Sequence, residues 1–116
     1  MPMVRVSNGG TSQPYIALTN SGSASPRYVV SSGNNLTSNN VSPNFTLAIN
    51  PGNYSKYKVV HSAFGANYAY AVLKNGSAQE IGSLNTNEHI VPNDCALIVV
   101  FNGGSGGPYS LNVTLS

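Results

Sequence analysis

The sequence predicts an all-β protein, an antiparallel β-sandwich of jelly-roll-like order with about eight to ten short strands. Three observations carry this prediction. Only 7% of the residues are charged, so long helices would lack the Lys, Glu and Arg that keep an exposed helix face in water. No window repeats apolar residues at helical spacing over several turns. Short apolar runs bounded by Gly, Pro and Asn recur instead, which is typical of strands joined by turns.

The chain has room for one hydrophobic core, so residues 1–116 are expected to form a single domain. Its polarity comes from Asn, Ser, Thr and Gly, which favour turns and strand ends over helix interiors. Aromatic residues and valines recur along the whole chain, and the net charge is only +2. A disordered chain would have few aromatics and a high net charge, so a folded domain is predicted.

The first third of the chain is predicted to alternate short strands with polar loops. Apolar runs predict strands at residues 4–6, 15–19 and 28–31, with a loop at 7–14 between the first two. Residues 32–43 form the longest polar stretch of the sequence and are predicted to be a surface loop.

The next segment is predicted to contain two strands joined by a tight turn. Phe45, Leu47 and Ile49 alternate with smaller or polar residues, the pattern of a half-buried strand. At residues 50–53, Pro suits the first central position of a turn and Gly the second, where φ is positive. Residues 54–63 are the longest strand candidate, and Phe64-Gly65 is expected to end it.

The last third contains the clearest local signal. Asn75-Gly76 follows a strand candidate at 67–74 and predicts a type I′ hairpin turn, so that residues 78–81 pair with 71–73. Residues 96–101 are apolar on both faces, which predicts a central strand covered on both sides. The final strand, Tyr109 to Ser116, alternates between apolar and polar residues.

A pattern near the start of the chain recurs near its end. Residues 8–15 read Asn-Gly-Gly-Thr-Ser-Gln-Pro-Tyr, and residues 102–109 read Asn-Gly-Gly-Ser-Gly-Gly-Pro-Tyr. Two interpretations stay open: one loop used twice in a pseudo-symmetric sandwich whose first and last strands are neighbours, or coincidence in a Gly-rich chain. Under the first, the loops are candidate contact sites, with residues Asn8, Gly9, Gly10, Tyr15, Asn102, Gly103, Gly104 and Tyr109.

The titratable residues do not predict an enzyme. Gly103 to Gly107 matches the Gly-x-Ser-x-Gly pattern of hydrolases, but no His or acid lies downstream of it. Glu88, His89 and Asp94 form the one cluster of titratable groups, and adjacent strand residues point to opposite faces. Cys95 precedes an apolar run and is expected to be a small buried side chain. No catalytic residue is assigned.

No metal or other cofactor is predicted. Calcium usually takes several carboxylate ligands, and the chain has three Asp and Glu residues in total. A zinc site would need His61, His89 and Cys95 to converge without the ligand spacing typical of zinc proteins.

The C-terminal third resembles the small calcium-dependent bacterial galactose lectins. The matching features are Val91-Pro92-Asn93-Asp94, the apolar strand at 96–101, a Gly-rich loop after Asn102, and Tyr109 to Val113. The resemblance implies a jelly roll. It departs from that family where the acidic calcium ligands are expected, because Gly103, Gly104 and Gly106 stand there.

The expected partners are other proteins. Five dispersed Lys and Arg residues are too few for a nucleic-acid footprint, and no stretch is long enough for a membrane span. Residues 1–6 lack the basic start and apolar run of a signal peptide, so cytoplasmic synthesis is expected.

Two functions are compatible with this sequence. The first is a non-enzymatic structural protein of a virion or assembled surface, such as a phage capsid decoration or tail-associated protein, packing on neighbouring subunits as a homo-oligomer (for example a trimer) or on a shell. The alternative is a lectin-like module that binds neutral glycans, with aromatic rings stacking on sugars. The candidate rings are those of Tyr54, Tyr57, Tyr68 and Tyr70.

Overall fold

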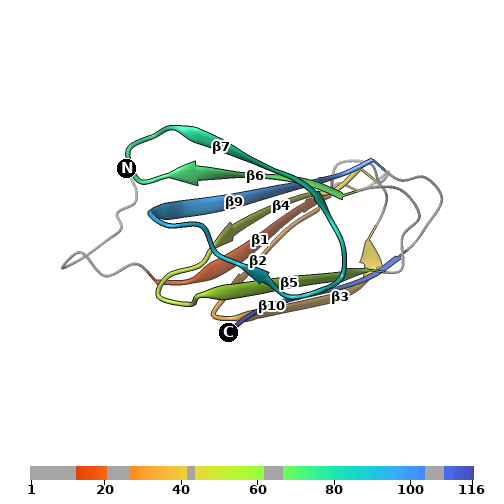
Figure 1. Ribbon diagram of the computed structural model, residues 1–116. Coiled ribbons are helices and arrows are strands. Elements are labelled where there is room, and N and C mark those ends of the chain that lie inside the picture. Colours follow the sequence, from red (N-terminus) through yellow and green to blue (C-terminus); the bar gives the residue numbers. More distant parts are fainter. Residues whose placement is uncertain (1–12, 21–26, 42–43, 62–66, 104–108) are drawn as a thin grey trace.

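The computed structural model describes residues 13–20, 27–41, 44–61, 67–103 and 109–116. Ten strands in these ranges form two antiparallel sheets, which lie one above the other in Figure 1. The predicted all-β sandwich is therefore confirmed. Within the described ranges, no helix is long and apolar enough to cross a membrane.

The larger sheet has six strands in the order β2-β1-β4-β9-β6-β7. The central strand β9 pairs with β4 on one side and with β6 on the other, as its apolar sequence predicts. The bounds of the six strands are β1 (Tyr15–Asn20), β2 (Arg27–Ser32), β4 (Thr46–Asn50), β6 (Asn67–Leu73), β7 (Ala78–Leu84) and β9 (Cys95–Asn102).

The smaller sheet has four strands in the order β3-β10-β5-β8. The last strand, β10, lies between β3 and β5, and Ser116 exchanges backbone hydrogen bonds with Lys56 at 3.0 Å in each direction. The bounds of these strands are β3 (Asn35–Val41), β5 (Lys56–His61), β8 (His89–Ile90) and β10 (Tyr109–Leu115).

The core lies between the two sheets. Every second residue of the central strands points into it, because side chains alternate along a strand. In β4 these residues are Leu47 and Ile49, and in β10 they are Tyr109, Leu111, Val113 and Leu115. The largest fully buried side chains are Tyr57 and Phe45, so aromatic rings fill much of the space between the sheets.

The predicted loop at 32–43 is wrong for most of its length. β2 runs to Ser32, and residues 35–41 form β3, paired with β10. β3 is an edge strand whose core contribution is Leu36 and Val41, while Thr37 and Asn39 are exposed. Because this edge strand buries so few apolar side chains, its sequence has the polar composition of a loop, and composition alone does not distinguish the two.

Two predicted turns lie where expected but differ in type. At the β6–β7 hairpin, Gly76 N–H donates to Leu73 O at 2.9 Å, and Gly76 has φ +90° whereas Asn75 is not in the positive-φ region. This is the three-residue loop with a glycine at its third position, not type I′. The strand pairing itself is confirmed, with Ala71 opposite Gln79.

The turn after β4 is displaced by one residue. Tyr54 N–H donates to Pro51 O, so Gly52, with φ +57°, occupies the first central position instead of the second. The Asn50 side chain accepts a hydrogen bond from Gly52 N–H at 3.0 Å, which fixes this frame. The following strand, β5, consequently begins at Lys56 and not at Tyr54.

Some predicted elements lie outside the described residues. They are the strand at 4–6, the strand break at 64–65 and most of the two Gly-Gly loops. The strands that begin at Tyr15 and Tyr109 belong to different sheets, so the echoed tyrosines do not start neighbouring strands.

Candidate functional site

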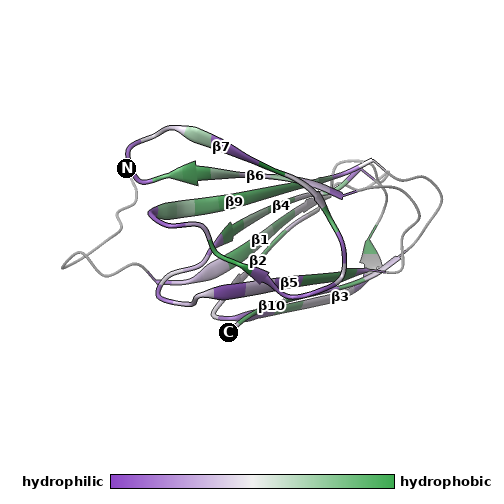
Figure 2. Cartoon of the chain, viewed as in Figure 1, coloured by the Kyte–Doolittle hydropathy of each residue, from purple (hydrophilic) through white to green (hydrophobic). Residues whose placement is uncertain are grey.

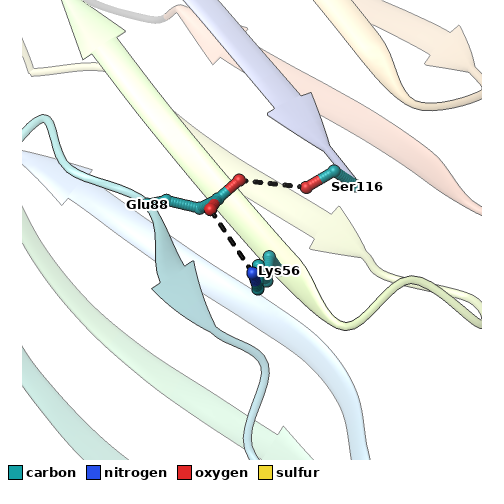
Figure 3. A network of polar contacts seen from close by, with 3 residues as sticks. All are labelled: Lys56, Glu88 and Ser116. Carbon is teal, nitrogen blue, oxygen red and sulfur yellow. Dashed lines mark hydrogen bonds and ion pairs between the residues drawn. The ribbon is translucent and has the colours of Figure 1, made fainter.

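Glu88, from the predicted cluster of titratable residues, forms a surface contact. The Glu88 carboxylate lies 3.7 Å from Lys56 Nζ and accepts a hydrogen bond from Ser116 Oγ at 3.1 Å, as Figure 3 shows. The Lys56 and Glu88 side chains are both about half exposed, so water screens the pair. The contact joins the start of β5 to the last residue of the chain.

The other two residues of the cluster, His89 and Asp94, do not form a site with Glu88. The His89 ring stacks on Tyr57 with centroids 5.4 Å apart, and Asp94 is a turn residue with φ +57° whose carbonyl accepts from Lys74 N–H. Among the described residues, no group of three or more His, Cys, Asp or Glu side chains could hold a metal ion.

The other reactive side chains are packed in or beside the core. Burial lowers the pKa of His61, whose ring lies edge-on to Phe45, and burial raises the pKa of the Cys95 thiol. Burial, followed by the charge of Cys95, raises the pKa of Tyr57 to about 12. A buried thiol with a raised pKa is a poor nucleophile, because little thiolate forms near neutral pH.

Three of the residues predicted to bind a partner lie inside the protein. Tyr57 and Tyr109 are buried in the core. Asn102 is also buried: its Nδ2 donates to Asn67 Oδ1 at 2.8 Å, and its Oδ1 accepts from Asn44 N–H at 3.3 Å. These side chains hold the sandwich together and do not form a surface.

The remaining predicted residues are exposed or lie outside the described ranges. Tyr54 is exposed before β5, Tyr15 is half-buried at the start of β1, and Gly103 is exposed with open space around it. Asn8, Gly9, Gly10 and Gly104 lie outside the described residues.

The structure instead brings together an apolar surface on the larger sheet, on the side that faces away from the core. We call it the outer face. Strand register sets its side chains in two rows across β2, β1, β4, β9 and β6. One row is Val30, Ala17, Ala48, Val99 and Tyr70; the other is Tyr28, Thr19, Thr46, Phe101 and Tyr68. Within the first row, Ala17 and Val99 are buried.

Aromatic rings gather at the β6–β9 side of the outer face. The Phe101 and Tyr70 rings stack with centroids 5.8 Å apart, and Phe101 and Tyr68 are 43% and 41% exposed. The Tyr68 hydroxyl donates to the Glu80 carboxylate on β7. Among the described residues of these rows and their extension onto β7, Glu80 is the one charged side chain.

The smaller sheet presents a different surface to solvent. Its outward residues on β10 are Ser110, Asn112 and Thr114, beside Lys56 and Lys58 of β5. The Asn112 amide donates to Asn35 Oδ1 and to Thr37 Oγ1, each at 2.9 Å, so polar side chains bind one another there. Figure 2 shows the difference in hydropathy between β9 and the start of β5.

Sequence reasoning named Tyr68 and Tyr70 but missed Phe101, Tyr28 and Val30. The prediction that residues 96–101 are covered on both sides is wrong at Phe101, which is 43% exposed. The available signal was the alternation of Val99 and Phe101 with Ile98 and Val100, which places two apolar rows on opposite faces of one strand.

Compared with known proteins, the chain matches no family model, no curated protein and no solved structure.

Proposed function

We propose that this protein is a non-enzymatic assembly component, of the kind that builds or decorates a virion or another surface structure, and that it packs on neighbouring copies through the outer face. The observation that carries the proposal is the contrast between the two outward surfaces. One carries the stacked rings of Tyr70 and Phe101 beside the exposed Tyr68, whereas the other mixes the exposed Val60 and Ile90 with Lys56, Lys58 and a hydrogen-bonded Asn112. An antiparallel sandwich needs an apolar surface only where something covers it.

The size of the outer face supports this proposal. Strands about 4.8 Å apart and rows about 6.8 Å apart give the five strands and two rows an extent of about 24 by 14 Å. This is about 330 Å², within the size range of the largest apolar patches on monomeric proteins, which are often functional. The interfaces of stable complexes have an apolar centre of this kind with aromatic residues in it.

Charge also favours contact between copies. The chain has eight charged residues, five basic and three acidic, so equal surfaces repel one another little. Glu80, at the rim of the outer face, already accepts a hydrogen bond from Tyr68. Copies can therefore approach without burying an unpaired charge at the centre of the contact.

Sedimentation velocity of the purified protein over a range of concentrations tests the proposal. The wild type should associate, and Phe101→Lys should raise the apparent dissociation constant at least about tenfold because it places a charge in the apolar contact. Val60→Lys is the matched control: Val60 is 38% exposed and lies on the outward side of the smaller sheet, opposite Asn112. Equal association of both variants and the wild type would contradict the proposal.

The aromatic cluster supports a second candidate function, the binding of neutral glycans. The stacked Tyr70 and Phe101 rings and the exposed Tyr68 ring form a platform beside a carboxylate that accepts hydrogen bonds. Sugar rings stack on such faces, as other planar apolar groups do. A neutral-glycan array distinguishes the two functions: binding that Phe101→Lys abolishes, together with a monomeric wild type, would favour the glycan.

A further inference from the structure

The larger sheet has two edges, and they differ in how well they resist pairing with another strand. At one edge, β7 carries the charged Glu80 and a register shift opposite Ala69 and Tyr70, with Gly82 at φ +101°. A bulge and a charge are both devices that block the pairing of an edge strand.

The edges of the smaller sheet are blocked as well. β8 is only two residues long and is followed by Val91-Pro92. β3 pairs with β10 through a register shift between Tyr109 and Leu111. Short length and irregular register both prevent the continuous ladder that an added strand needs.

Among the described residues, the edge at β2 has only one of these protections, the charge of Arg27 at its first residue. Its six residues pair with β1 without a register shift, from Arg27 opposite Asn20 to Ser32 opposite Tyr15. The strand contains no Pro, and its middle is Tyr-Val-Val. Tyr28, Val29 and Val30 are 69%, 41% and 49% exposed, so apolar side chains are open on both faces of the strand.

We propose that β2 pairs antiparallel with β2 of a second copy, so that the two larger sheets form one continuous sheet across a two-fold axis. This inference rests on the proposed function, because it specifies how neighbouring copies meet. The register of β2 indicates that the added strand is β2 of a second copy. Residues that lie opposite each other in antiparallel strands point to the same face of the sheet. A two-fold axis normal to the sheet must therefore pass beside a residue that lies opposite its own copy. Val29 and Val30 are the middle residues of β2, so the axis passes beside one of them.

The register centred on Val29 is self-complementary. It sets Tyr28 opposite the partner's Val30 twice, an aromatic and β-branched pair that stabilises antiparallel strands. Arg27 comes opposite the partner's Ser31, so no two like charges face each other. Tyr28 and Val30 both belong to the outer face, so the pairing joins two outer faces into one apolar surface of twice the width.

A charge-swap experiment tests this contact. Val29 lies next to its own copy at the axis, so Val29→Lys and Val29→Glu should each place like charges in contact and raise the dissociation constant at least about tenfold. An equimolar mixture of the two variants should restore association as a mixed dimer, observed by native mass spectrometry. Gln79→Lys is the matched control and should associate like the wild type, because Gln79 is exposed on the edge strand β7 and lies opposite Ala71, away from the outer face.

The outcomes separate this contact from the proposed function. Association of Val29→Lys and Val29→Glu at wild-type strength, or a mixture with no mixed dimer, would overturn the β2 pairing. In that case, loss of association in Phe101→Lys would still support packing through the outer face. Circular dichroism of each variant checks that the sheets are intact, which is expected because residue 29 is exposed.

Discussion

Replacing Asn102 by alanine is expected to lower the free energy of unfolding by about 3 kcal/mol. The Asn102 side chain donates to Asn67 and accepts from Asn44 N–H, and it is 4% exposed. Each buried hydrogen bond contributes about 1 kcal/mol, and the Asn67 oxygen left without its donor adds about 1 kcal/mol more. With an unfolding entropy of about 2.1 cal/mol/K per residue, the midpoint temperature should fall by about 12 °C.

Urea denaturation followed by far-ultraviolet circular dichroism measures this effect. The chain has no Trp, so tyrosine fluorescence is the second probe. Asn67→Ala and the double variant complete a mutant cycle, in which the pair should show a coupling of about 1 kcal/mol. Asn85→Ala is the control, because the Asn85 side chain is exposed and accepts a local hydrogen bond from Asn87 N–H. A loss below about 1 kcal/mol for Asn102→Ala, or strictly additive single effects, would refute the reasoning.

Two buried tyrosines give further predictions. The Tyr109 hydroxyl is buried and has no hydrogen-bond partner among the described residues, so Tyr109→Phe should raise the free energy of unfolding by about 1 kcal/mol. A clear loss of stability, measured by urea denaturation, would show that the hydroxyl has a partner. The pKa of Tyr57 is raised from 10.0 to about 12, so the folded protein favours the neutral phenol. The stability that this preference contributes is complete below pH 10, where the unfolded chain is also neutral, and is lost as the pH rises towards 12. The urea midpoint should therefore fall less between pH 9.5 and 11.5 in Tyr57→Phe than in the wild type, and an equal fall would contradict this.

The fold class could be predicted because the local signals agree with the tertiary structure. The Asn75-Gly76 pair marks the β6–β7 hairpin, and the alternation in β4 and β10 marks their buried faces. The turn types could not be predicted, because strand register decides them. Pairing of β6 with β7 leaves three residues in the hairpin loop, so Gly76 takes positive φ and Asn75 does not.

The candidate site was harder to predict, for a physical reason. In β9 both rows of side chains are apolar, so the sequence does not show which row faces the other sheet. The row with Ile98 and Val100 meets the core, and in the other row Phe101 is exposed whereas Val99 is buried. Likewise, Tyr57 and Tyr68 are chemically identical side chains. Packing buries Tyr57 and leaves Tyr68 exposed, and the residue type does not show which is which.

The bulged edge strand β7 has a consequence for how far such an assembly can grow. A sheet with two open edges can add copies at both ends and elongate into a fibre. Here one edge of the larger sheet carries Glu80 and the Gly82 bulge, so a pair joined through β2 presents a blocked strand at each of its two rims. Lateral growth of the sheet then terminates at two copies, so the apolar edge at Tyr28 to Val30 can be exposed at high concentration without polymerisation.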